Sequence, residues 1–85
     1  MKILKFNAVW CPSCLVMKQT FKQIEKEYPN IEFISYDYDF NEEEVNKYDI
    51  GKKLPVIIKT DDNFNEIKRL IGEKTKKEII SFIEE

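Results

Sequence analysis

The sequence is poor in the residues that most metal sites require. Its 85 residues include no histidine and only two cysteines. A tetrahedral zinc or iron–sulfur site would therefore need a partner chain or carboxylates, and carboxylates seldom complete structural zinc sites. We expect no metal and no cofactor. A non-enzymatic dimer, bridged by a metal through the two cysteines, stays open as an alternative.

The sequence also lacks long apolar runs and basic clusters. No run approaches the roughly 20 residues that span a bilayer as a helix. Net charge is −2, which argues against nucleic-acid binding as the main function. Residues 1–6 are too short and too charged to form a signal peptide. We therefore expect a cytoplasmic protein without a membrane or nucleic-acid partner.

Apolar residues are plentiful for a short chain. They make up 42% of it, and aromatic residues make up 13%. This content is enough for a compact core and is unlike that of a disordered polymer. We predict a single domain over residues 1–85, acting as a monomer. Since stable disulfides are uncommon in the cytoplasm, the cysteine pair is expected to be redox-active or metal-binding.

The two cysteines are Cys11 and Cys14, at the start of a helical pattern. Residues three apart on a helix lie on nearly the same face, so their sulfurs can form a disulfide. The free N–H groups and the dipole at a helix start stabilise a thiolate on Cys11. Pro12 fits the first turn, where no N–H is needed. The pattern predicts thiol–disulfide exchange.

Helical periodicity predicts different roles for the two cysteines. Cys14 falls on the apolar stripe of the helix, whereas Cys11 lies ahead of it. We therefore expect an exposed Cys11 that attacks the substrate disulfide and a shielded Cys14 that resolves the mixed disulfide. The residues that share the stripe with Cys14 are Met17, Phe21, Ile24 and Tyr28.

The rest of the chain alternates strand and helix signals. The predicted order is β-α-β-α-β-β-α, an α/β fold. Its strands cover residues 1–9, 31–38, 54–59 and 65–71, and its helices cover residues 12–28, a short segment from 41, and a final segment from 75. Two crossover helices imply parallel strands, and the hairpin adds an antiparallel edge. Helices should cover both faces of one sheet, with the cysteines at the carboxyl end of the first strand.

Local signals mark the ends of these elements. Asn41 can cap the second helix, with Glu44 at the capping-box position, and Gly51 is expected to stop that helix. Residues 61–63 have the chemistry of a turn. Thr75 and Glu78 form a predicted capping box for the last helix.

Several motifs together resemble the thioredoxin family over nearly the whole chain. Residues 10–14 read Trp-Cys-Pro-Ser-Cys, similar to the WCxxC active site, and Leu54-Pro55 resembles the cis-proline site. Tyr48, Ile50 and Gly72 also match. The resemblance implies a minimal thioredoxin fold with a four-stranded mixed sheet.

The resemblance also implies a function. The chain would be a protein-disulfide reductase that acts on disulfide-containing proteins and receives electrons from a thioredoxin-reductase-like donor. Leu54-Pro55 would be a cis bond facing the cysteines, with the Leu54 backbone pairing with substrate. Trp10, Pro12 and Pro55 would form the contact surface.

The sequence departs from the family pattern in three places. It lacks the extra N-terminal strand and helix of full-length thioredoxins. Pro-Ser between the cysteines is similar to the glutaredoxin arrangement, which leaves glutathione-dependent reduction as an alternative. Residues 71–74, however, lack the paired glycines and following acidic residues of a glutathione site, so a thioredoxin-like activity is preferred.

Lys5 is the third departure, because thioredoxins usually carry a buried acid at this position. A charged lysine cannot accept the proton of the resolving thiol, but it can lower the pKa of a nearby thiol by Coulomb attraction. One hypothesis is therefore that Lys5 favours thiolate at the cysteine pair. The other is that Lys5 packs its stem and reaches the end of the sheet with its ammonium.

Overall fold

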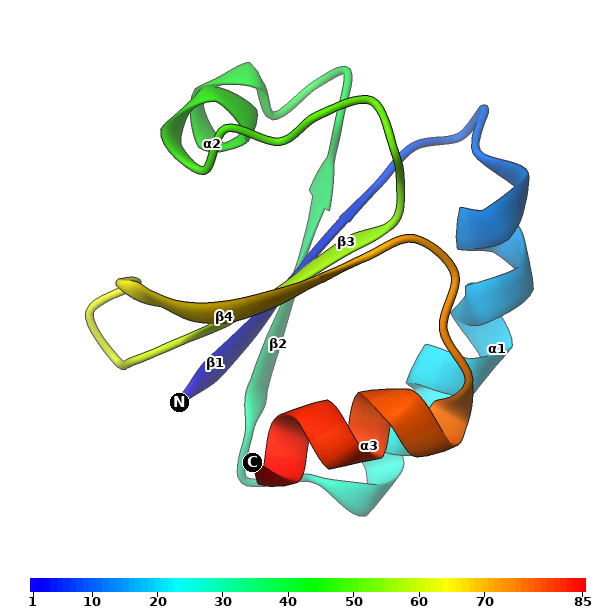
Figure 1. Cartoon of the computed structure of the whole chain (residues 1–85), viewed down its shortest axis with the longest axis vertical. Helices are drawn as coiled ribbons and strands as arrows, with labels where there is room; N and C mark the ends of the chain where they lie inside the picture. The colour runs from blue at the N-terminus through cyan, green and yellow to red at the C-terminus, as the bar shows by residue number, and fades with distance from the viewer.

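The computed structural model describes all residues from Met1 to Glu85 (Figure 1). The predicted order β-α-β-α-β-β-α is confirmed, although most elements are slightly shorter than predicted. None of the helices combines the length and apolarity needed to span a bilayer. In chain order the elements are β1 (Lys2–Asn7), α1 (Pro12–Glu27), β2 (Glu32–Asp37), α2 (Glu42–Lys47), β3 (Val56–Thr60), β4 (Glu66–Ile71) and α3 (Lys76–Glu84).

The four strands form one mixed sheet in the order β2-β1-β3-β4. β1 and β2 are parallel, whereas β3 is antiparallel to both β1 and β4. The expectation that the second crossover helix returns the chain to a parallel strand was therefore wrong. The six-residue α2 lies at the end of the sheet where β2 stops, and the chain enters β3 from that same end (Figure 1).

This reversal sets the position of the proline motif. Val56, the first residue of β3, pairs with Phe6 near the end of β1. Leu54-Pro55 therefore lies near the carboxyl end of β1, the same end of the sheet from which the chain continues to Cys11. If β3 were parallel to β1, its first residues would lie at the opposite end of the strands, far from Cys11.

Helices cover both faces of the sheet, as predicted. α1 and α3 lie on one face and α2 lies on the other (Figure 1). The central strands β1 and β3 send alternate side chains to the two faces, so both faces are buried. The core on the α1 and α3 face contains Ile3, Met17, Phe21, Ile24, Ile57, Ile79, Phe82 and Ile83. The core on the α2 face contains, among others, Leu4, Phe6, Val45, Tyr48, Ile50, Val56 and Ile58.

Both ends of α2 differ from the sequence prediction. Asn41 is the N-cap residue but makes no side-chain cap, because its Oδ1 accepts the N–H of Asp37 at 2.7 Å. Gly51 does not stop the helix. Instead, Asp49 adopts a positive φ of 51°, and the N–H of Ile50 donates to the carbonyl of Val45 at 3.0 Å. This is the Schellman ending, in which aspartate takes the position usually held by glycine.

The ends of α3 are fixed by polar contacts. The predicted capping box is confirmed: Thr75 Oγ1 accepts the N–H of Glu78 at 3.2 Å, and Glu78 Oε1 accepts the N–H of Thr75 at 3.1 Å. At the other end, the buried Lys59 of β3 donates to the carbonyls of Phe82 and Glu85. A cation at a helix C-terminus is favoured by the helix dipole.

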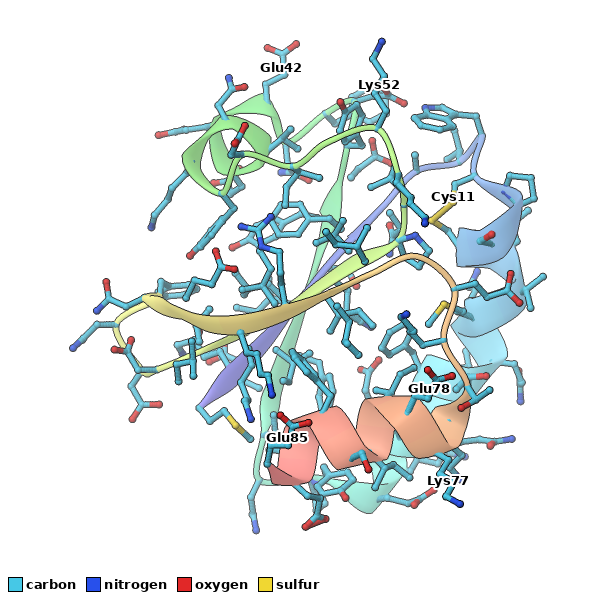
Figure 2. All side chains as sticks on the ribbon, viewed as in Figure 1. Cys11, Glu42, Lys52, Lys77, Glu78 and Glu85 are labelled. Carbon is cyan, nitrogen blue, oxygen red and sulfur yellow. A yellow bond between two sulfur atoms is a disulfide. The ribbon has the colours of Figure 1, made fainter.

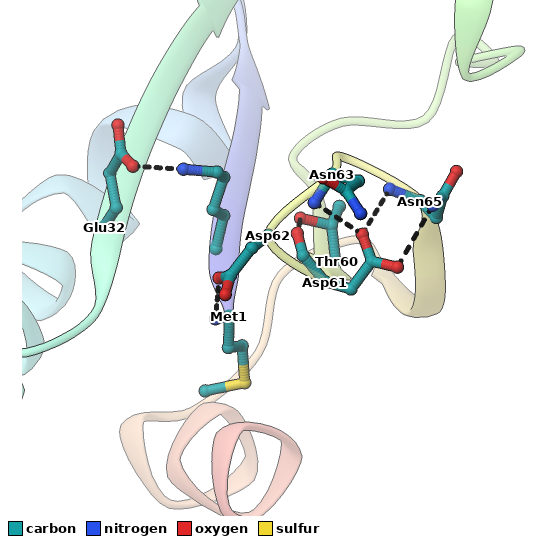
Figure 3. Close-up of polar contacts among 8 residues, drawn as sticks. Met1, Glu32, Thr60, Asp61, Asp62, Asn63 and Asn65 are labelled. Carbon is teal, nitrogen blue, oxygen red and sulfur yellow. Dashed lines mark hydrogen bonds and ion pairs between the residues drawn. The ribbon is translucent and has the colours of Figure 1, made fainter.

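The predicted turn between β3 and β4 is built on Asp61 (Figure 3). Asp61 Oδ1 accepts the N–H groups of Asn63 and Asn65 at 2.8 and 3.0 Å, and Oδ2 accepts the Asn65 side-chain amide. These bonds, led by those from Asn65, lower the pKa of Asp61. In the same turn Asp62 pairs with the amino group of Met1 at 2.6 Å, which ties the turn to the start of β1.

Removing the α3 capping box should destabilise the fold. We expect Thr75→Ala to lower the free energy of unfolding by about 1 kcal/mol, the usual effect of losing a threonine N-cap. Urea unfolding followed by circular dichroism measures the change. Ser81→Ala on the exposed side of α3 is the matched control and should cause no loss. Equal effects of the two substitutions would contradict the capping role.

The Asp61 turn should make stability depend on pH. Because the folded pKa is lowered, the stabilisation is present above the ordinary carboxyl pKa of about 4 and is lost as pH falls through the folded value. We expect Asp61→Asn to flatten the loss of stability on acidification, measured by urea unfolding at neutral and acidic pH. The control Glu73→Gln removes an exposed carboxylate that makes no hydrogen bond or ion pair, and it should leave the acid dependence unchanged.

Candidate active site

Cys11 is the N-cap residue of α1, as the sequence predicted. Its backbone is extended, with φ −96° and ψ 108°, and Pro12 occupies the first helical turn. The N–H of Cys14 donates to Cys11 Sγ at 3.2 Å. The first turn holds no acidic residue, so no nearby carboxylate in that turn opposes a negative charge on the sulfur. Figure 2 shows the Cys11 sulfur at this end of α1.

The two cysteines form a disulfide in this structure. Their Cα atoms are 5.3 Å apart, within the range that an unstrained backbone allows. The helical spacing of three residues is therefore sufficient to pair them. The site can exist as a disulfide or, with two added electrons and two protons, as a dithiol.

The burial of the two cysteine residues is the reverse of the prediction. Cys11 is only 4% exposed and belongs to the core that also contains Ala8 and Leu54. Cys14 is partly exposed and lines a cavity. The predicted stripe of α1 is buried at Met17, Phe21 and Ile24. Cys14, in the first turn, packs against the core on the α2 face but also borders the cavity, so it is only partly buried.

The Leu54–Pro55 peptide bond is cis, as the resemblance implied. The Pro55 carbonyl accepts the N–H of Gly72 at 2.8 Å, and Gly72 adopts a positive φ of 92° that suits glycine. Pro55 lines the same cavity as Cys14. Both Leu54 and Pro55 are buried, so the Pro55 ring itself adds little exposed surface beside Trp10 and Pro12.

Trp10 is exposed and is not part of the core. Its side chain is 53% exposed, its Nε1 donates to Asp39 Oδ2 at 2.8 Å, and its ring meets Tyr38 edge-on at 6.0 Å. These contacts fix the indole beside Cys11 while its face stays accessible. Pro12 is exposed as well.

Three exposed apolar residues near Trp10 were missed by the sequence reasoning. Val9, Leu15 and Val16 are 76%, 64% and 64% exposed. The signal that could have found them is their place immediately beside the cysteine motif and off the buried stripe of α1. Together with Trp10 and Pro12 we call these residues the apolar rim.

Lys5 is buried next to α1, on the face opposite to α2. Its Nζ forms an ion pair with Glu25 Oε2 at 2.6 Å and lies 5.0 Å from the centre of the Phe21 ring. The stem of Lys5 is packed, as one interpretation expected, and its ammonium is held against α1 by Glu25. Glu25 was missed because its partner comes from a different element and no local pattern links them.

The cavity beside Cys14 has a volume of about 480 Å³. It lies against α1 and the ends of β1 and β2, and Pro55 closes one side. Lys5 and Glu25 line it together with two further lysines of α1, Lys18 and Lys22. No cluster of three or more histidine, cysteine or acidic side chains suited to a metal is present.

Comparison with known proteins agrees with this geometry. The thioredoxin family model matches residues 1–85. Thioredoxin H5 of Oryza sativa subsp. japonica is 37% identical over 70 residues, which are 82% of this chain and 50% of that protein. The chain thus spans about half the length of this curated relative.

Solved structures of thioredoxins are also similar. The thioredoxin of Fasciola hepatica superimposes with a TM-score of 0.88 at 26% identity, over 98% of this chain and 77% of that one. Thioredoxin-2, a component of the malaria parasite protein secretion machinery, gives a TM-score of 0.86 at 27% identity, over 98% of this chain and 80% of that one. The chain belongs to the thioredoxin family.

Proposed function

We propose that this protein is a thiol–disulfide oxidoreductase that reduces protein disulfides through Cys11 and Cys14. The observation that carries the proposal is the Cys11 sulfur at the start of α1, bonded by the N–H of Cys14 and close enough to Cys14 for a disulfide. The dithiol gives two electrons and two protons to the substrate and becomes the disulfide.

Cys11 is the attacking residue in this proposal and Cys14 the resolving one. The Cys11 thiolate attacks one substrate sulfur, the substrate disulfide breaks, and the other substrate sulfur leaves as a thiolate. Cys14 then attacks Cys11 Sγ and releases the second substrate sulfur. The assignment rests on charge, because helix N–H groups stabilise the thiolate of Cys11, and not on the exposure of Cys11 in the disulfide form.

The substrate is proposed to lie across the apolar rim and the backbone of Leu54. The peptide N–H and carbonyl of Leu54 make no hydrogen bond within the chain, so both are available to an extended substrate segment, as in strand addition. Pro55 has no N–H and cannot donate to a competing strand. The apolar rim supplies the kind of aromatic and aliphatic contacts that anchor protein interfaces.

The cellular setting is also a proposal. The protein would act in the cytoplasm as a monomer, with residues 1–85 as one domain. It would carry no cofactor and would be returned to the dithiol by a thioredoxin-reductase-like donor. An assay with glutathione as the sole reductant tests the glutaredoxin-like alternative. Rapid turnover under that condition would favour the alternative.

Single cysteine substitutions should separate the two roles. We expect Cys11→Ser to abolish reduction of a protein disulfide such as that of insulin, because the activated sulfur is lost. Cys14→Ser should attack once and then remain as a mixed disulfide, which mass spectrometry of the intact protein detects. Full turnover by either variant, or trapping by Cys11→Ser instead of Cys14→Ser, would refute the assignment.

Lys5 is proposed to favour thiolate at the cysteine pair, with Glu25 moderating its charge. We expect Lys5→Met to lower the thiolate fraction of the reduced protein about threefold, and Glu25→Gln to raise it, because the Lys5 ammonium then loses its partner. Ultraviolet absorbance of the thiolate measures the fraction. Lys2→Met is the control, because Lys2 lies on the same strand as Lys5 and its ammonium is paired with Glu32 of β2. The idea fails if Lys5→Met matches the wild type, or if Lys2→Met lowers the thiolate fraction as much as Lys5→Met does.

A further inference from the structure

β2 is an edge strand whose outer side is unpaired. Its only neighbour in the sheet is β1. Tyr38, which follows the strand, directs its N–H inward to the carbonyl of Asn7 at 2.8 Å. Successive residues of a strand direct their peptide groups to opposite sides in turn. The peptide groups of Phe33, Ser35 and Asp37 therefore point outward, away from β1.

Four of these outward groups have no partner in the chain. Asp37 is closed off by Asn41, whose Oδ1 accepts the N–H of Asp37 at 2.7 Å and whose N–H donates to the carbonyl of Asp37 at 2.8 Å. No such contact reaches the peptide groups of Phe33 or Ser35. Two N–H groups and two carbonyls are thus available to an added strand.

The opposite edge of the sheet is protected against such pairing, whereas β2 is not. β4 carries Lys68 and Arg69, and its pairing with β3 is interrupted by a register shift at Lys59 and Thr60. Charged side chains and irregular pairing are the usual features that keep an edge strand from binding another strand. β2 pairs with β1 in continuous register and contains no lysine, arginine or proline. The free edge of β2 is therefore the one suited to strand addition.

Partly exposed apolar side chains flank this edge on both faces of the sheet. Phe33 packs against the core on the α1 and α3 face, and Ile34 and Tyr36 pack against the core on the α2 face. All three are only partly buried. The side chains of an added strand would cover them, so backbone hydrogen bonds would be accompanied by burial of apolar surface.

The charge next to this edge is acidic. From residue 27 to residue 46 the sequence has seven acidic residues and no lysine or arginine. Glu27 and Glu32 form ion pairs, whereas the other five form none. These five lie at the carboxyl end of β2, in the turn that follows and in α2, which Figure 1 shows at the same end of the sheet; they are Asp37, Asp39, Glu42, Glu43 and Glu44.

We propose that the edge of β2 binds an extended segment of another protein, which adds to the sheet as a fifth strand and places basic residues beside Asp39 and Glu42. Opposite charge at that end of the strand attracts such a segment. A second copy of this chain is a poorer partner, because it brings the same acidic stretch to the edge. The inference goes beyond the proposed function, since it does not depend on the chemistry of the cysteines.

The position of the basic residues follows from the charges on the other side of β2. Lys18 and Lys22 line the same cavity as Ser35 and Asp37, against α1. Positive side chains along the middle of the edge would therefore meet positive charge on that face. The segment should have uncharged residues where it pairs with Phe33 and Ser35, and basic residues only where it passes the carboxyl end of β2.

Peptides that differ in one property at a time test the proposal. The probe has a middle of alternating valine and threonine, two lysines at each end and a fluorescent label, and its binding to the full chain is followed by anisotropy. We expect replacement of the lysines by glutamate to weaken binding about tenfold at low ionic strength.

Methylation of alternate peptide nitrogens tests the backbone bonds. One alternate set of N–H groups faces β2 and the other faces solvent, so methylating one set should abolish binding and methylating the other should leave it nearly unchanged. Equal effects of the two sets would show that the peptide is held by charge alone and would overturn the proposal.

Ser35→Pro tests the edge from the side of the protein. It removes an outward N–H and breaks no bond to β1, and proline is tolerated where a strand's N–H faces solvent. We expect this variant to lose the lysine peptide, whereas the control Ser35→Ala keeps the N–H and should bind it like the wild type. Equal binding by the two variants would contradict strand addition. Circular dichroism checks the fold of Ser35→Pro, and the methylated peptides decide if it does not fold.

Glu42→Gln tests the placement of the basic residues. Figure 2 shows Glu42 on α2, with its carboxylate away from the sheet. We expect the loss of this partly screened charge to weaken the lysine peptide about twofold at low ionic strength. Glu73→Gln makes the same change in net charge between β4 and α3 and should have no effect. If the two variants weaken binding equally, the effect is one of overall charge and the placement is wrong.

Sedimentation of the chain without peptide tests the alternative occupant. We expect a monomer in the wild type and in Ser35→Pro. A wild-type dimer that Ser35→Pro converts to a monomer would mean that a second copy occupies the edge, and the choice of a basic partner would be rejected. Reduction of insulin tests the proposed function separately, because binding of the lysine peptide involves neither cysteine.

Discussion

The hydrogen bond from the N–H of Cys14 to Cys11 Sγ is the contact on which the site depends. It places one sulfur at the positive end of α1 and holds the other within disulfide reach. It requires α1 to begin at Pro12, and so it requires β1 to end a few residues earlier at the same edge of the sheet. The side chains of β1 and β3 point alternately to the two faces of the sheet and are buried in the core on each face. This packing holds the carboxyl end of β1 in place.

The antiparallel direction of β3 is the second constraint. Because the chain turns back through α2 at the end of the sheet, Leu54 and Pro55 arrive beside Cys11 and Cys14 and not at the far edge. The Asp49 turn after α2 and the bond from Gly72 to Pro55 support this approach. The short helix α2, which ends at Asp49 with a positive φ, therefore affects the site directly. It reverses the chain so that the cis-proline lies beside the two cysteines.

The region around the cysteines combines an exposed apolar rim with a cavity, and Val9 and Leu15 belong to both. The apolar rim of Val9, Trp10, Pro12, Leu15 and Val16 faces solvent and suits a protein surface. The cavity beside Cys14 has largely apolar walls, with Lys18 and Lys22 of α1 in its lining. The ion-paired Lys5 and Glu25 line this cavity as well.

Local signals in the sequence were sufficient for the elements, the capping box of α3, the Asp61 turn and the Cys11 N-cap, because each depends on residues within about one helical turn or one tight turn. The cis bond followed from the family resemblance. The direction of β3, the burial of Cys11, the partial exposure of Cys14 and the pairing of Lys5 with Glu25 were decided only by the tertiary structure. Each of these depends on residues distant in sequence that meet through packing, and the periodicity of a single element carries no information about its neighbours.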